Sequence, residues 1–223
     1  MENLFVLLLI LPIVGAILAG ILQRKSSDFT AILFASVVFV LGAYVAASGY
    51  AQSFRFDIST GLSWIKAKMS FFGFMLDPLS ALMLFIITTI GFLVVLYSIS
   101  YVSPKNAEHP IQNGKNSFHF WMLLFIGSMI GVALSPNFLQ LFIFWELTTI
   151  CSWALISFYK SEKSLFSGFK ALIMTHVGGL FLMTAIVILF INTRSFEFSA
   201  MNKLSPSLRD ALFVLILVGA WSK

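Results

Sequence analysis

The sequence predicts an all-α, polytopic membrane protein built as a bundle of about seven transmembrane helices. Of its 223 residues, 59% are hydrophobic and only 10% are charged. A soluble domain carries about 25% charged residues, so this chain has too few charges to cover a surface that faces water. The apolar runs are continuous rather than alternating, which disfavours a transmembrane β-barrel.

Apolar runs of about the length of a membrane span follow one another along the whole chain. They cover about Leu4–Leu22, Phe29–Tyr50, Asp77–Tyr101, Phe118–Leu134, Phe138–Tyr159, Leu165–Ile191 and Ser207–Lys223. The first run follows an acidic residue, Glu2, rather than the basic segment of a signal peptide, so we interpret it as a membrane helix. The second run is rich in Ala and Gly, which favours close packing between helices.

Polar segments connect these runs. The longest, Ala51–Phe74, is predicted to be a loop with a short β-hairpin formed by Phe54–Ile58 and Leu62–Lys66. Asp77 comes directly before Pro78, an order that predicts a helix N-cap followed by the first helical turn. The last run is only about 15–17 residues long, shorter than the ~20 residues needed to cross a bilayer. We therefore expect the sequence to be a fragment of a longer chain.

Several functional classes find no support in the sequence. The formal charge of +5 does not indicate nucleic-acid binding, because the basic residues are scattered between apolar runs. Cys151 is the only cysteine, which leaves no disulfide framework and no metal-binding cysteine cluster. We find no phosphate loop, dinucleotide fingerprint, nucleophile triad or haem-ligand pair. The chain is therefore predicted to hold no cofactor, no metal and no catalytic residue, and any redox chemistry would belong to other subunits.

Glu146 is the most informative residue, because it lies inside an almost wholly apolar segment, FIFWELTTICSWALISF. A carboxylate in the hydrocarbon region costs about 2.5–3.5 kcal/mol on insertion scales, so it is rarely without a partner or a function. Glu146 lies about eight residues into its run, which is about 12 Å deep and close to the bilayer centre. Lys223 lies at a similar depth in the seventh run, which crosses in the same direction. A Glu–Lys pair is therefore geometrically available.

Burial opposes the charged form of each group in such a pair, whereas an opposite charge nearby favours it. A pair balanced between the two effects binds and releases a proton near neutral pH, as a proton or cation path through a membrane requires. Lys170 and His176 of the sixth run are further candidates. Lys170 is equally well explained by a side chain that extends to the interface, and His176 by a structural hydrogen bond. Their separation of six residues places them on different faces of a straight helix.

Four segments of the sequence resemble helices three to seven of one family. They are FMLDPLSALMLFIITTIGFLVVLYSISYVS, FHFWMLLFIGSMIGVALSPNFLQLFIFWELTTICSWALISFY, FSGFKALIMTHVGG and GAWSK. The family comprises the antiporter-like subunits shared by respiratory complex I, Mrp-type Na+/H+ antiporters and membrane-bound hydrogenases. The resemblance covers most of Phe72–Lys223 and implies a truncated antiporter-like region at 72–223, while residues 1–71 are predicted to form an N-terminal transmembrane hairpin with a polar loop. The antiporter-like region would contain most of one five-helix repeat, whereas family members have about fourteen or more helices in two inverted repeats.

The resemblance also implies roles for individual residues. Glu146 is similar to the family's helix-five glutamate, which would tune the protonation of Lys223. Lys223 would be the helix-seven lysine of the central proton relay, and Lys170 a helix-six lysine that lines the path. His176 is tied less closely to the family, which varies at that position.

These observations lead to one main functional hypothesis and two alternatives. The main hypothesis is a multi-pass subunit of the cell membrane that translocates protons, sodium ions or both within a larger respiratory, hydrogenase-type or Mrp complex. Its partners would be other membrane subunits, lipid and the transported ions, and the sequence leaves the complex, the ion and the orientation open. The first alternative is a non-conducting scaffold whose buried charges specify helix packing. The second is a stand-alone transporter of an organic solute, which predicts a site near the bilayer midplane.

Overall fold

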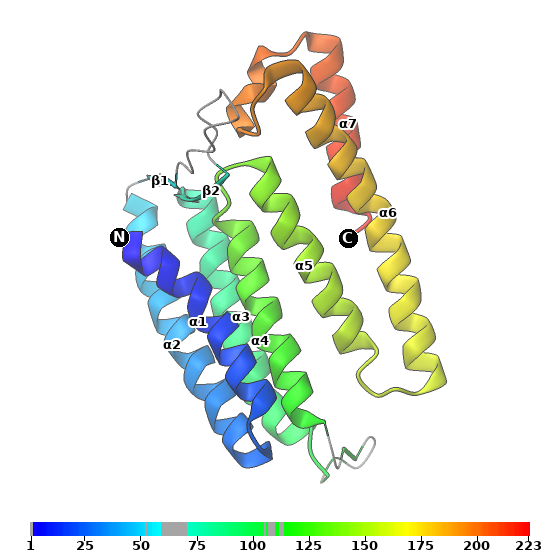
Figure 1. Cartoon of the computed structure of the whole chain (residues 1–223). Helices are drawn as coiled ribbons and strands as arrows, with labels where there is room; N and C mark the ends of the chain where they lie inside the picture. Colours follow the sequence, from blue (N-terminus) through cyan, green and yellow to red (C-terminus); the bar gives the residue numbers. More distant parts are fainter. Residues whose placement is uncertain (1, 52, 59–70, 105, 107–109, 112–113) are drawn as a thin grey trace. The chain divides into compact units, whose positions relative to one another are not determined.

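The computed structural model describes all residues except 1, 52, 59–70, 105, 107–109 and 112–113, and its described part is mainly helical (Figure 1). The helices are α1 (Glu2–Ile21), α2 (Arg24–Ala51), α3 (Pro78–Tyr101), α4 (Lys115–Ala133), α5 (Phe138–Ile156), α6 (Glu162–Thr193), the 3-10 helix η1 (Phe198–Lys203) and α7 (Pro206–Trp221). Two strands, β1 (Phe54–Ile58) and β2 (Phe72–Leu76), form a small sheet. Within the described residues, helices α1 to α6 are long and apolar enough to cross a membrane. The predicted polytopic all-α fold is confirmed.

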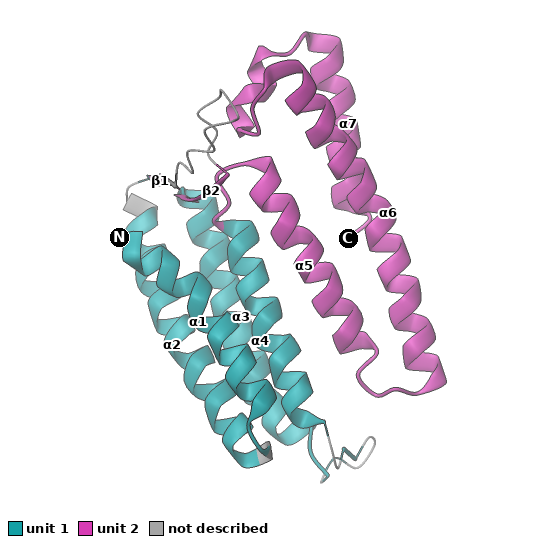
Figure 2. Cartoon of the chain, viewed as in Figure 1, with its two compact units in different colours: residues 1–54, 76–133 teal, residues 55–75, 134–223 magenta. Residues whose placement is uncertain are grey.

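The chain divides into two compact units (Figure 2). Unit 1 comprises residues 1–54 and 76–133, and unit 2 comprises residues 55–75 and 134–223. The boundary predicted between residues 71 and 72 stays a prediction.

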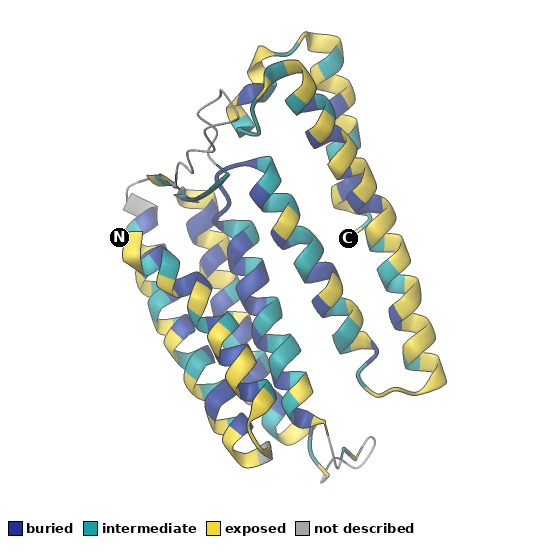
Figure 3. Ribbon diagram, viewed as in Figure 1, coloured by how far each residue is buried: buried dark blue, intermediate teal, exposed yellow. Residues whose placement is uncertain are grey.

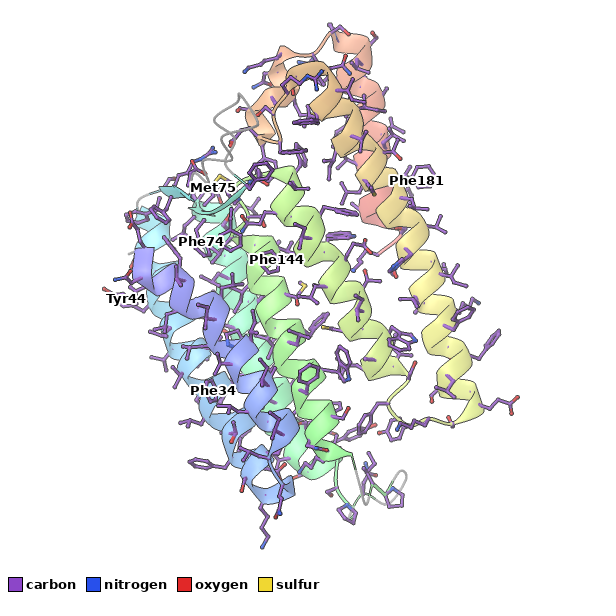
Figure 4. All side chains as sticks on the ribbon, viewed as in Figure 1. Phe34, Tyr44, Phe74, Met75, Phe144 and Phe181 are labelled. Carbon is purple, nitrogen blue, oxygen red and sulfur yellow. The ribbon has the colours of Figure 1, made fainter. Side chains whose placement is uncertain are left out.

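Unit 1 is a bundle of the helices α1 to α4. Helix α1 packs against α2 and α4, α2 also packs against α3 and α4, and α3 packs against α4. Small residues allow these contacts: a Cβ atom at Gly15 of α1 would lie 2.6 Å from the ring of Phe34 on α2 (Figure 4). At Gly42 of α2 a Cβ atom would lie 2.6 Å from Thr88 of α3. The expected close packing of the Gly- and Ala-rich second helix is therefore present.

Unit 2 contains α5, α6, η1 and α7, together with most of the small sheet. Helix α6 packs against both α5 and α7, and η1 also packs on α6. A buried cluster joins the C-terminal part of α6 to η1 and the first half of α7. Its members are Ala185, Leu189, Ala200 and Leu212.

The outer surface of both units is apolar. Figure 3 shows exposed positions along most of α6, and these include Phe166, Met174 and Leu180. Large apolar side chains that face outward in such numbers are costly in water but stable against lipid. The distribution agrees with the membrane-spanning lengths of the helices and places this multi-pass chain in a bilayer.

The helix boundaries differ in detail from those expected. Helix α2 begins five residues earlier than predicted, and α4 begins at Lys115 rather than at Phe118. Polar residues in the first turns hid these starts, because hydrophobicity marks only the lipid-embedded part of a helix. Helix α7 has 16 residues, in agreement with the short length expected from the sequence.

Two local predictions concern the connection before α3. Asp77 is the N-cap of α3, where its side chain accepts a 2.7 Å hydrogen bond from the backbone N–H of Ser80, as predicted. Strand β1 coincides with the predicted first arm of a hairpin, but it pairs with β2. The predicted second arm, residues 62–66, lies outside the described residues.

Candidate functional site

Helix α5 carries the central residue of the candidate site and has a well-defined start. The side chain of Asn137 caps the helix by accepting a 2.8 Å hydrogen bond from the backbone N–H of Gln140. The amide of Gln140 then binds the backbone of Gly73 in β2 twice, accepting from its N–H at 2.9 Å and donating to its carbonyl at 3.0 Å. Gln140 is buried, so these two bonds fix the first turn of α5 against the sheet.

The carboxylate of Glu146 lies between α5 and α6. Its Oε2 atom is 3.6 Å from Nδ1 of His176 on α6, a contact that becomes an ion pair when the imidazole is protonated. The other oxygen, Oε1, is buried and has no hydrogen-bond partner in the described part of the chain. A buried acceptor without a donor is costly, so this oxygen has an unused capacity to bind a proton or a cation.

Lys223 reaches α5 from the end of α7. Its Nζ atom donates a hydrogen bond to the backbone carbonyl of Trp145 at 3.0 Å and a second, short one to Oγ1 of Thr149. The ammonium group also lies 5.1 Å from the centre of the Trp145 ring, within the range of a cation–π contact. Trp145, the residue next to Glu146 in the chain, thus binds the lysine, so the ammonium group of Lys223 lies at the turn of α5 that carries Glu146.

Two successive glycines of α6 make this arrangement possible. A Cβ atom at Gly179 would collide with Oε1 of Glu146, and a Cβ atom at Gly178 would collide with Oγ of Ser222, the neighbour of Lys223. Consecutive helical residues point in directions about 100° apart. Gly179 therefore faces α5, and Gly178 faces the end of α7. The Gly178-Gly179 pair therefore leaves room for Glu146 and for Ser222, the residue before Lys223.

The predicted site residues are only partly brought together. Glu146 and His176 are in contact, and Lys223 is bound to the turn of α5 that carries Glu146. No direct Glu146–Lys223 ion pair occurs among the described residues, so that pair stays a prediction. Lys170 is exposed and makes no polar contact with any described residue. It lies six residues before His176 on α6, about 9 Å away along the helix axis.

Thr149 is the site residue that sequence reasoning missed. It follows Glu146 by three residues, a spacing that places both on one face of the helix, and this was the available signal. Hydroxyl groups in membrane helices usually bond to a carbonyl four residues earlier, so in the sequence alone Thr149 carried no functional signal of its own.

The described residues contain no cluster of three or more His, Cys, Asp or Glu side chains that could hold a metal ion.

The fold and the site together define a multi-pass membrane protein with titratable groups inside its helices. Comparison with known sequences identifies its relatives. The family described as "NADH:quinone oxidoreductase/Mrp antiporter, TM" matches residues 135–223, which contain all four predicted site residues. The family described as "NADH-Ubiquinone oxidoreductase (complex I), chain 5 N-terminus" matches residues 64–108.

Curated relatives include the Na(+)/H(+) antiporter subunit A1 of Staphylococcus aureus. It is 35% identical over 221 residues, which cover 96% of this chain and 27% of the relative. The same subunit of strain JH9 is 39% identical over 168 residues, covering 73% of this chain and 20% of the relative. The chain thus spans about a quarter of the length of the curated relatives it matches.

Solved structures share the fold. The Mrp complex from Dietzia sp. DQ12-45-1b aligns with a TM-score of 0.77 and 24% identity, covering 98% of this chain and 23% of the matched chain. The membrane-bound sulfane sulfur reductase, an archaeal respiratory membrane complex, aligns with a TM-score of 0.76 and 16% identity over 96% of this chain and 43% of the matched chain. The chain is a partial homologue of the antiporter-like subunits of Mrp antiporters and complex I, and the resemblance inferred from its sequence is confirmed.

Proposed function

We propose that the chain forms an ion-translocating part of an antiporter-like subunit, in which Glu146 and Lys223 belong to a proton relay. The subunit would act in the cell membrane with other membrane subunits and would carry protons, sodium ions or both. The proposal rests on one turn of α5. This turn carries Glu146, whose Oε1 atom has no hydrogen-bond partner among the described residues, and it binds the ammonium group of Lys223. An ionisable residue inside a membrane helix has a functional role by default.

The contacts of Lys223 support a group that gives up its proton readily. The acceptors of its ammonium group are a carbonyl and a hydroxyl, both of them neutral, whereas a direct carboxylate partner would hold the ammonium form far more tightly. Glu146, one residue from Trp145, then acts on Lys223 through its charge rather than through a bond. Protonation of Glu146 would remove that charge and favour release of the proton from Lys223.

The contact of Glu146 with His176 supports a second position for the same proton. The imidazole is partly exposed, with 52% of its side chain accessible, and approaches Oε2 to 3.6 Å. A histidine with one face open and the other near a carboxylate can carry a proton between the two environments. We assign His176 this delivering role and leave Lys170, which is exposed on the same helix, as a residue that lines the path.

The names of the relatives support this proposal and favour one type of complex over the others. The curated relatives are named as Na(+)/H(+) antiporter subunits, which favours an Mrp-type complex and coupling of protons to sodium ions. A redox-driven complex would need partners that carry electrons, and purification of the assembled complex would identify them.

The test is pH-gradient formation in everted membrane vesicles that contain the assembled complex. We expect Glu146→Gln and Lys223→Ala each to abolish the sodium-dependent pH gradient while the complex still assembles. Glu162→Gln is the matched control, because Glu162 lies in the first turn of α6 and is exposed. If the gradient per assembled complex survives both substitutions while the amount of assembled complex falls, the charges act as a packing scaffold and the proposal is wrong.

A further inference from the structure

A second group of titratable side chains lies in unit 1, where α2 and α4 begin and α3 ends. It consists of Asp28 on α2 with Lys115 and His119 on α4, surrounded by the hydroxyl groups of Ser27 and Ser98. His119 is fully buried and Lys115 is 4% exposed, whereas 23% of the Asp28 side chain is accessible. A lysine is almost never buried to this degree without a specific partner. We call this group the Asp28 cluster.

The carboxylate of Asp28 lies between the two basic residues. Its Oδ2 atom accepts a 2.8 Å hydrogen bond from Nζ of Lys115, which also donates to the carbonyl of Ile99 at 2.8 Å. Its Oδ1 atom lies 3.7 Å from Nδ1 of His119. This oxygen is buried and has no hydrogen-bond partner in the described part of the chain. One carboxylate oxygen is thus satisfied by lysine, and the other faces histidine without a donor.

The hydroxyl groups of the two serines indicate which protonation state of His119 this structure accommodates. The hydroxyl of Ser98 donates to the carbonyl of Val95 at 2.7 Å, so its oxygen is free to accept a hydrogen bond from Nε2 of His119 at 3.4 Å. Nδ1 of the ring lies 3.1 Å from Oγ of Ser27, which can donate to it. A neutral imidazole with its hydrogen on Nε2 satisfies both contacts but leaves Oδ1 of Asp28 without a donor.

We propose that the Asp28 cluster is a proton-binding site, separate from the Glu146 site, in which His119 takes up one proton with Asp28 as its counter-ion. The added hydrogen on Nδ1 makes the ring a cation, and Oδ1 of Asp28 lies within ion-pair distance of that nitrogen. Nε2 keeps its bond to Ser98, whereas the hydroxyl of Ser27 rotates so that its oxygen accepts from Nδ1 instead of donating to it. The proton enters through Asp28, the one partly accessible ionisable group of the cluster.

Burial of the ring, which opposes its protonated form, and the charges around His119 together set the balance of this site. Asp28 of α2 favours the protonated ring and Lys115 of α4 opposes it. Helix α3 contains no charged residue, and the only charged residue of α1, Glu2, lies at the other end of that helix. Uptake of a proton therefore changes the cluster from a neutral pair of Asp28 and Lys115 to a net charge of about +1. A histidine that serves only to pack the core would keep its neutral form.

The composition of the chain makes the site directly measurable, because the sequence has only three histidines. We propose nitrogen-15 histidine NMR of the full chain in lipid nanodiscs, titrated from about pH 3 to about pH 9, a range that extends below the ordinary imidazole transition because burial disfavours the charged ring. His119→Gln and His176→Gln assign the signals. We expect the His119 signal to change from one neutral tautomer to the imidazolium form as the pH falls.

Substitutions of the two charged neighbours are expected to act in opposite directions. Asp28→Asn should keep His119 neutral over the whole range, and Lys115→Met should move the midpoint upward by at least about one pH unit. If either variant fails to fold, Asp28→Glu and Lys115→Arg retain the charges and should retain the transition. A His119 signal that stays neutral in both the native chain and Lys115→Met overturns the proposal. Glu146→Gln should leave the titration unchanged, which separates this site from the proposed relay.

Discussion

Gly179 of α6 faces the carboxylate of Glu146 on α5 so closely that the Cβ atom of any other residue there would collide with Oε1. The absence of a side chain at this position, rather than any attractive contact, lets the carboxylate lie between the helices. The neighbouring Gly178 gives the same room to Ser222 beside Lys223. The positions of the Glu146 carboxylate and of the residue before Lys223 therefore depend on two glycines.

Gly179→Ala is expected to displace the Glu146 carboxylate and to lengthen its contact with His176. Sodium-dependent pH-gradient formation should fall by at least about tenfold, because a catalytic group shifted by about 1 Å loses up to about a hundredfold in rate. Leu180→Ala is the control, since Leu180 is the next residue on α6 and is exposed. Equal gradients in the two variants would show that the position of the carboxylate does not limit transport.

Thr149→Val is expected to weaken the binding of the Lys223 ammonium group while keeping the shape of the side chain. A hydrogen bond to a charged group contributes about 1.5–3 kcal/mol, so the alkaline limb of the pH profile of transport should move to lower pH. The control is Thr148→Val, because both hydroxyls donate to the carbonyl of Trp145 but only Thr149 binds Lys223. Identical pH profiles for the two variants would remove Thr149 from the site.

The fold was largely predictable because hydrophobicity and length determine where a helix crosses a membrane. The predicted runs correspond to α1 to α7, and the N-cap of α3 at Asp77 follows from its side chain and from Pro78. Glu146 was equally predictable, because a carboxylate in an apolar run is costly wherever the other helices lie.

The partners of these residues could not be predicted from the sequence. Contacts such as that between Lys223 and Thr149 depend on how α7 packs beside α5, and no local pattern specifies this. The Asp28 cluster was hidden for a related reason. Its residues lie at helix ends, where charged side chains are normally solvated, and only the packing of α2, α3 and α4 shows that His119 and Lys115 are buried.

Arg55→Met is expected to have little effect on stability, although Arg55 binds both Asp57 and Glu197. Hydrogen bonds from Arg55 to these two carboxylates raise its pKa above the ordinary value, so the guanidinium stays charged at every pH that the protein tolerates. Its side chain is 42% exposed, however, and exposed ion pairs contribute only about 0–1 kcal/mol. The free energy of unfolding in detergent, compared at low and high salt, should show a small difference that salt removes. A large difference that persists in high salt would contradict this view.

Gln140→Leu is expected to be far more destabilising than loss of the exposed ion pair. The substitution leaves both the N–H and the carbonyl of Gly73 without their partner in a buried place, and each such group costs about 1–3 kcal/mol. The loss would fall at the first turn of α5, so the helix start should loosen and the free energy of unfolding should drop by about 2–6 kcal/mol. Gln23→Leu provides the control, because Gln23 is an exposed glutamine just after α1. Equal unfolding free energies for the two variants in the same detergent would mean that Gln140 does not hold α5 to the sheet.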